Sequence, residues 1–157
     1  PKARMLGVDY GKAPKDYQTG PIRITFRYEI PDYALVGDRE LLLKPMVMNN
    51  LYASVLSFLR IDTGLETRQY DACSRLVELD ETIALPRGYR LAGEPRSEQK
   101  AAPAADFEGS LQQVGNKLVL KQKLALKKRI YRAADWEGFR AAVNAYKSFA
   151  DYLIVKL

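Results

Sequence analysis

The clearest pattern in the chain is a two-residue alternation of apolar and polar side chains. Between residues 22 and 30 an apolar side chain stands at every even position, and Arg, Thr or Glu stands between them. Successive side chains of a β-strand point to opposite faces, so this pattern predicts a half-buried strand that ends at Pro31. Residues 39–44 predict a short second strand before Pro45.

The alternation returns in the second half of the chain. Residues 75–85 predict a strand, and Pro86-Arg87-Gly88 predicts a turn after it. Residues 106–114 predict another strand, and Gly115-Asn116 predicts a hairpin turn into a strand over 117–132. That last strand would carry five apolar residues on one face: Leu118, Leu120, Leu124, Leu126 and Ile130. It is long for one strand, so a bulge or bend is expected near Lys127-Lys128.

Helical spacing appears near the end of the chain. The apolar positions are Trp136, Phe139, Val143, Tyr146 and Ala150, with polar residues between them. Asp135 is the predicted N-cap, and Glu137 lies in the first turn, where the helix dipole favours an acid. Residues 152–157 predict a final strand, and residues 46–60 predict a further short helix.

The remaining segments define the domain organisation. Residues 1–15 lack apolar periodicity and predict a linker or lead-in, and residues 93–105 predict a polar surface connection. Residues 16–157 then form a single domain. Strands that follow one another without helices between them favour antiparallel sheet. We therefore predict a mainly β fold: an antiparallel β-sandwich with one C-terminal amphipathic helix and a final short strand.

Composition excludes several kinds of chemistry. The 157 residues contain no histidine, and Cys73 is the one cysteine. The chain therefore cannot assemble a Cys–His or Ser–His–Asp nucleophile, a His/Cys zinc site or an internal disulfide. Without an imidazole to activate it, Cys73 is interpreted as an inert small apolar residue. We predict no catalytic, cofactor-binding or metal-binding residue, and no enzymatic activity.

Two other groups have a functional and a structural interpretation. Glu78, Asp80 and Glu81 could bind a hard cation or supply a carboxylate pair for glycoside cleavage. On a strand, however, Glu78 and Asp80 share the face opposite the apolar residues, which is typical of a solvated face. The aromatic set of Trp136, Phe139 and Tyr146 could form a ligand platform, but its helical spacing favours the core. No apolar run is long enough to span a bilayer.

Charge is concentrated in one segment. The chain has a net charge of +6, and residues 117–132 contain seven cations and no acid. Four of them form the candidate interaction surface: Lys121, Lys123, Lys127 and Arg129. Such a stretch could contact phosphates, anionic glycans or an acidic protein surface, or could protect a sheet edge. No RNA-binding aromatic motif accompanies it, so nucleic acid is not the expected partner. If the strands over 75–85 and 117–132 are neighbours in one antiparallel sheet, we expect the acids Glu78 and Asp80 to meet the lysines Lys121 and Lys123 across it.

A family resemblance covers residues 75–157. Its motifs are Leu85-Pro86-Arg87-Gly88-Tyr89, the Gly115-Asn116 hairpin with its basic strand, Ile130-Tyr131, and Trp136-Glu137-Gly138-Phe139-Arg140 at the start of the helix. This order resembles the C-terminal β-domain that follows the transglutaminase-like, papain-type core in a family of bacterial, usually exported proteins. The resemblance implies that the catalytic Cys, His and Asp lie in that neighbouring core, upstream of Pro1.

The resemblance implies a non-catalytic accessory domain in the periplasm or at the cell surface. The domain would pack against the catalytic core of the same polypeptide or against a protein partner. Two alternatives stay open: a carbohydrate- or polyanion-binding module of the same shape, and an enzyme that uses carboxylates alone. An exposed apolar patch would favour docking, whereas a concave groove lined by aromatic residues would favour a ligand.

Overall fold

The computed structural model describes residues 3–11, 23–45, 70–71, 74–149 and 152–157. It divides the chain into two compact units, Pro1–Leu35 and Val36–Leu157. This division differs from the boundary predicted between residues 15 and 16. The predicted helix over 46–60 and Cys73 lie outside the described residues.

The first unit contains a two-stranded antiparallel sheet of β1 (Arg4–Asp9) and β2 (Thr25–Glu29). The strand predicted over 22–30 is confirmed as β2. Its predicted half-burial holds for Tyr28 and Ile30, whereas the apolar side chains of Ile24 and Phe26 are 44% and 54% exposed. The first strand, β1, lies within the segment predicted as a lead-in.

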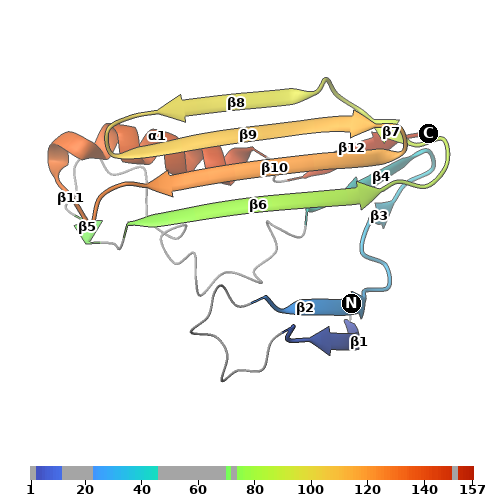
Figure 1. Cartoon of the computed structure of the whole chain (residues 1–157). Coiled ribbons are helices and arrows are strands. Elements are labelled where there is room, and N and C mark those ends of the chain that lie inside the picture. The colour runs from blue at the N-terminus through green and yellow to red at the C-terminus, as the bar shows by residue number, and fades with distance from the viewer. Residues whose placement is uncertain (1–2, 12–22, 46–69, 72–73, 150–151) are drawn as a thin grey trace. The chain divides into compact units, whose positions relative to one another are not determined.

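The second unit is built on a four-stranded antiparallel sheet with the order β6-β10-β9-β8 (Figure 1). Its strands are β6 (Arg75–Ala84), β8 (Arg96–Ala101), β9 (Ala105–Val114) and β10 (Lys117–Leu126). The predicted hairpin at Gly115-Asn116 is confirmed: it joins β9 to β10, and Gly115 takes a φ of +60° that a side chain would disfavour. The predicted connection over 93–105 is wrong, because it contains the edge strand β8.

The predicted strand over 117–132 is interrupted where a bend was expected. Strand β10 ends at Leu126, and the chain resumes as β11 (Ile130–Tyr131), which pairs with β5 (Tyr70–Asp71). Across the interruption the alternation moves by one residue. Ile130 is therefore 49% exposed and Tyr131 is buried, so the prediction that Ile130 continues the apolar face is wrong.

A second four-stranded sheet has the order β3-β4-β12-β7. Its strands are β3 (Leu35–Val36), β4 (Glu40–Leu43), β7 (Arg90–Leu91) and β12 (Leu153–Lys156). The predicted short strand over 39–44 and the predicted final strand are confirmed as β4 and β12. They pair directly, and their buried residues Leu43 and Leu153 lie opposite each other.

The predicted amphipathic helix is confirmed as α1 (Trp136–Ser148), which follows a 3₁₀ turn over Ala133–Asp135. The helix packs against β8, β9 and β10 (Figure 1). The largest fully buried side chains include Phe107, Leu111, Leu118, Leu120, Leu124, Tyr131, Trp136, Phe139, Val143 and Tyr146. The aromatic set of the helix thus belongs to the core. The fold is mainly β with antiparallel sheets, one C-terminal amphipathic helix and a final short strand, as predicted.

Gly138 allows the helix to approach the chain that leaves β8. A Cβ atom added to Gly138 would lie 2.6 Å from the Cβ atom of Ala102. Alanine favours a helix over glycine by about 1 kcal/mol, but overpacking costs about 1–3 kcal/mol. We therefore expect Gly138→Ala to lower the free energy of unfolding by about 1 kcal/mol, measured by urea denaturation. Adding Ala102→Gly should restore part of that loss, and a stabilised single variant would contradict the close approach.

Candidate functional site

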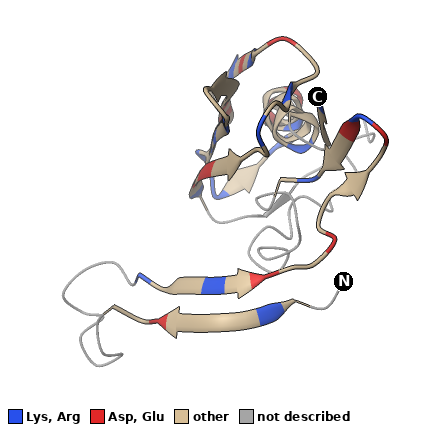
Figure 2. Ribbon diagram, turned by 90° about the vertical axis from the view of Figure 1, so that its right-hand side faces the viewer, with Lys and Arg blue, Asp and Glu red and all other residues tan. Residues whose placement is uncertain are grey.

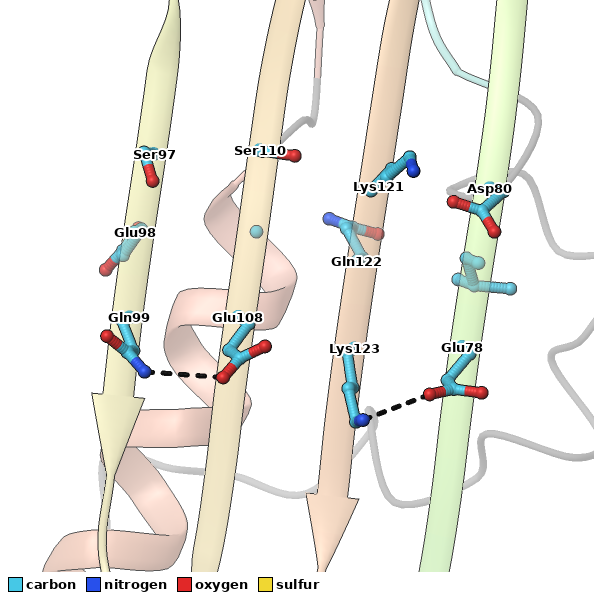
Figure 3. Close-up of a pocket in the computed structure, with 12 residues that line it drawn as sticks. Glu78, Asp80, Ser97, Glu98, Gln99, Glu108, Ser110, Lys121, Gln122 and Lys123 are labelled. Atoms are coloured by element: carbon cyan, nitrogen blue, oxygen red, sulfur yellow. Dashed lines mark hydrogen bonds and ion pairs between the residues drawn. The ribbon is translucent and has the colours of Figure 1, made fainter.

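The outer face of the sheet β6-β10-β9-β8 carries a cluster of polar side chains (Figure 3). A shallow hollow of about 540 Å³ lies over it. The two-residue period of each strand sends the apolar side chains to the helix and the polar ones to this face. The polar side chains that project here are Glu78, Asp80, Ser97, Gln99, Glu108, Ser110, Lys121 and Lys123.

One row of these side chains crosses all four strands in the order Gln99, Glu108, Lys123 and Glu78. The Lys123 Nζ atom lies 3.1 Å from Glu78 Oε1, and Gln99 Nε2 donates a hydrogen bond of 3.3 Å to Glu108 Oε1. The prediction that acids of β6 meet lysines of β10 across the sheet is confirmed for this pair. Both side chains are at least half exposed, so the pair contributes little to stability and is screened by salt.

A second row runs in the order Ser97, Ser110, Lys121 and Asp80. The register places Lys121 directly opposite Asp80, so this acid of β6 also faces a lysine of β10. Lys121 is exposed, and within the described part of the chain its ammonium group is not one of the salt-bridged cations. The face therefore alternates cationic, anionic and neutral polar side chains.

Lys127 and Arg129 do not lie on this face, because β10 ends at Leu126. The Lys127 Nζ atom donates hydrogen bonds to Ala102 O at 2.9 Å and to Asp106 Oδ1 at 2.7 Å. Arg129 is exposed in the interruption between β10 and β11. The four residues of the candidate interaction surface are thus divided between two places. Their role in binding stays a prediction.

The basic stretch is partly neutralised by its own domain. Lys128 forms an ion pair with Asp135 at the start of the helix, in addition to the pairs made by Lys123 and Lys127. Figure 2 shows basic and acidic segments interspersed along the ribbon. The segment with seven cations therefore does not form a continuous cationic surface.

Two carboxyl groups have altered acidity because of these lysines. The hydrogen bond from Lys127 lowers the pKa of Asp106 below its ordinary value of 3.8. The hydrogen bond from Lys128, together with the one that the Arg132 backbone N–H donates, lowers the pKa of Asp135. Asp135 stands at the N-cap position of α1, as predicted, but its side chain makes no capping hydrogen bond to that helix; the bond it accepts comes from Arg132 N–H at the start of the preceding 3₁₀ turn.

These shifts predict a loss of stability in acid. A carboxyl group whose folded pKa is lowered stabilises the fold above its unfolded pKa, and this stabilisation is lost as pH falls through the folded value. We expect the melting temperature to fall progressively as pH drops below about 3.8, the unperturbed value. The double variant Asp106→Asn, Asp135→Asn should show a shallower dependence in the same pH range. An unchanged slope would contradict the assignment.

The carboxylates of the outer face lie beside lysine side chains. Lys123 stands between Glu78 and Glu108, so those carboxylates compensate a cation instead of facing each other as a catalytic pair. Glu81 is on the opposite, half-buried face of β6, so the acidic trio of the sequence is not brought together. Among the described residues, no group of three or more Cys, His, Asp or Glu side chains is placed to hold a metal ion.

Gln122 is the polar residue that the sequence reasoning missed. It lies between Leu79 and Gly109 on the inner face of the sheet and is only 3% exposed. Neither its amide oxygen nor its amide nitrogen has a hydrogen-bond partner within the described residues. Gln122 shares one face of the strand with Leu118, Leu120 and Leu124, so its burial could have been predicted from the alternation.

The structure defines a β-domain. Positive and negative side chains compensate each other on the outer face of its sheet, and a helix covers the inner face. The chain belongs to the DUF3858 family, described as a domain of unknown function with a solved structure, and the match covers residues 39–155. No helix within the described residues is long and apolar enough to cross a membrane.

The fold is similar to that of a putative protease from Parabacteroides distasonis ATCC 8503, whose crystal structure was determined at 2.00 Å resolution. The TM-score is 0.62 and the sequence identity is 14%, so the similarity concerns the fold alone. It covers 78% of this chain but 24% of the other, so this chain spans about a quarter of the length of that protein. No curated protein matches the chain.

Proposed function

We propose that the chain is a non-catalytic accessory domain of an exported transglutaminase-like protein. It packs against the catalytic core of the same polypeptide or against a protein partner. The observation that carries this proposal is the shared fold, which accounts for 24% of a longer chain described as a putative protease. Three quarters of that chain lie outside the shared domain and have room for a catalytic core.

The side chains of this domain support a non-catalytic role. The whole sequence lacks histidine, so Cys73 and the serines have no imidazole base. The serines on the outer face, Ser97 and Ser110, lie beside each other in a row with one lysine and one carboxylate. The proposal therefore includes no cofactor, no metal ion and no reaction at this face.

The proposal is tested by assaying the purified chain on amide and ester substrates. We expect no turnover above the buffer rate, for the chain and for Cys73→Ala alike. Turnover that survives Cys73→Ala would reveal a catalytic site elsewhere in the chain. Turnover that is lost in Cys73→Ala would identify this thiol as a nucleophile, and either result would reject the accessory role.

The hollow on the outer face favours one alternative, a module that binds a glycan or another polyanion. Lys121 and Lys123 both project over it, but none of the described residues that line it is aromatic. Aromatic platforms are the usual means of binding sugars and single-stranded nucleic acid, so the accessory role is better supported. Binding of generic DNA should be weak and should vanish near ~150 mM salt. Submicromolar affinity at that salt concentration, lost in Lys121→Gln with Lys123→Gln, would favour the alternative.

A further inference from the structure

The apolar face of the N-terminal hairpin is largely uncovered by the described residues of its own unit, Pro1–Leu35. The register pairs Val8 with Phe26 and Met5 with Tyr28. The exposed fractions are 57% for Met5, 41% for Val8 and 54% for Phe26. The polar residues of β2 alternate with these apolar ones, so the hairpin has one apolar and one polar face.

The ends of the hairpin are locally satisfied. Arg4 forms an ion pair with Glu29, its direct partner across the two strands. At the other end Asp9 Oδ1 accepts a hydrogen bond of 2.8 Å from the backbone N–H of Gly11, which takes a φ of +63°. An isolated two-stranded hairpin is only marginally stable in water, and exposed apolar patches commonly mark interaction sites. The alternating sequence of β2 is that of a strand covered on one face.

The size of the face indicates what covers it. Strands of five or six residues are about 17–20 Å long, and two strands are roughly 10 Å wide, which gives a plan area near 170–200 Å². A stable complex between separate molecules buries roughly 800 Å² on each partner. A tethered domain needs less area, because the linker supplies a high effective concentration. The face is therefore smaller than the surface that separate molecules usually bury, which favours a tethered domain of the same polypeptide over a free partner or a second copy.

The first residue of the family match is consistent with docking of the hairpin on another domain of the same polypeptide. The family match starts at residue 39, after both strands of the hairpin. The solved relative has three quarters of its chain outside the shared fold. We propose that the apolar face formed by Met5, Val8, Phe26 and Tyr28 docks on the catalytic core of the same longer polypeptide. This inference rests on the proposed function and adds the contact surface to it.

The test compares hydrogen–deuterium exchange in the 157-residue chain with exchange in the longer polypeptide. We expect the β2 amides to exchange at least about tenfold more slowly in the longer polypeptide, the equivalent of ~1.4 kcal/mol. Phe26→Lys should abolish this protection. Thr25→Lys introduces the same side chain on the opposite face and should keep it. Val8→Thr is the milder second variant, and circular dichroism of each variant confirms folding.

Equal exchange rates in the two proteins would overturn the inference. So would a dimer of the 157-residue chain that Phe26→Lys dissociates, because the occupant would then be a second copy. A different outcome separates this inference from the proposed function. If the chain itself hydrolyses amides while the β2 amides are protected in the longer polypeptide, the accessory role fails and the docking surface stands.

Discussion

Replacing Phe139 with alanine is expected to lower the free energy of unfolding by about 3–5 kcal/mol, the range for deleting a fully buried phenylalanine ring. The side chain is 0% exposed. Its ring centroid lies 4.6 Å from that of Tyr131 and 5.3 Å from that of Trp136, so three aromatic rings fill one region beneath the sheet. The cavity left by truncation could close only if the helix moved towards the sheet.

Chemical denaturation monitored by the fluorescence of Trp136 measures this effect. Ile130→Ala is the matched control, because it removes an apolar side chain that is 49% exposed beside the same cluster. It should cost less than about 1 kcal/mol. A Phe139→Ala variant as stable as the parent would show that the ring is accessible in solution. The aromatic face of the helix would then return as a candidate ligand platform.

The strands that sequence reasoning located are those whose two faces differ. In β6 and β10 most residues of the inner face are apolar, with Arg75, Glu81 and Gln122 as exceptions, so the two-residue period can still be recognised. The same period predicted that acids of β6 would meet lysines of β10, and the register of the two strands then selects Glu78 and Lys123 as partners. The Gly115-Asn116 turn supplied the local signal that fixes the register of β9 against β10.

The elements that were missed lack that contrast. Strand β8 reads Arg-Ser-Glu-Gln-Lys-Ala, which is polar on both faces because it is an edge strand. Strand β1 contains a register irregularity between Met5 and Gly7, and an extra residue destroys a two-residue period. The exposure of Ile130 has a similar origin, since the alternation moves by one residue after Leu126.

The candidate site was predictable only where it lies within regular strands. The pairing of Lys127 with Asp106 arises after the chain leaves β10, where strand periodicity no longer applies. The buried amide of Gln122 shows the opposite limit. The alternation along the strand was enough to place Gln122 on the inner face. Which residues surround its amide group depends on how the strands and the helix pack together, and the pattern of one strand does not give this.

The second prediction with a large effect concerns Gly109, which lies on the inner face of β9 between two aromatic side chains. A Cβ atom at this position would lie 2.7 Å from Phe107 Cζ and 2.9 Å from Phe149 Cδ2 and Cε2. Both rings are almost fully buried and contact each other with a centroid distance of 5.6 Å, so neither can move into solvent. We expect Gly109→Ala to lower the free energy of unfolding by about 3 kcal/mol, at the upper end of the cost of overpacking.

Gly93→Ala is the matched control, because a Cβ atom there meets no other atom within 4 Å and should leave stability nearly unchanged. Phe149→Ala removes one of the two clashing rings from Gly109. The double variant should therefore be more stable than the sum of the two single effects by at least about 1 kcal/mol, as for residues in direct contact. Strict additivity, measured by urea denaturation of all four proteins of the cycle, would show that Phe149 does not pack on Gly109. The close approach of the helix C-terminus to β9 would then be excluded.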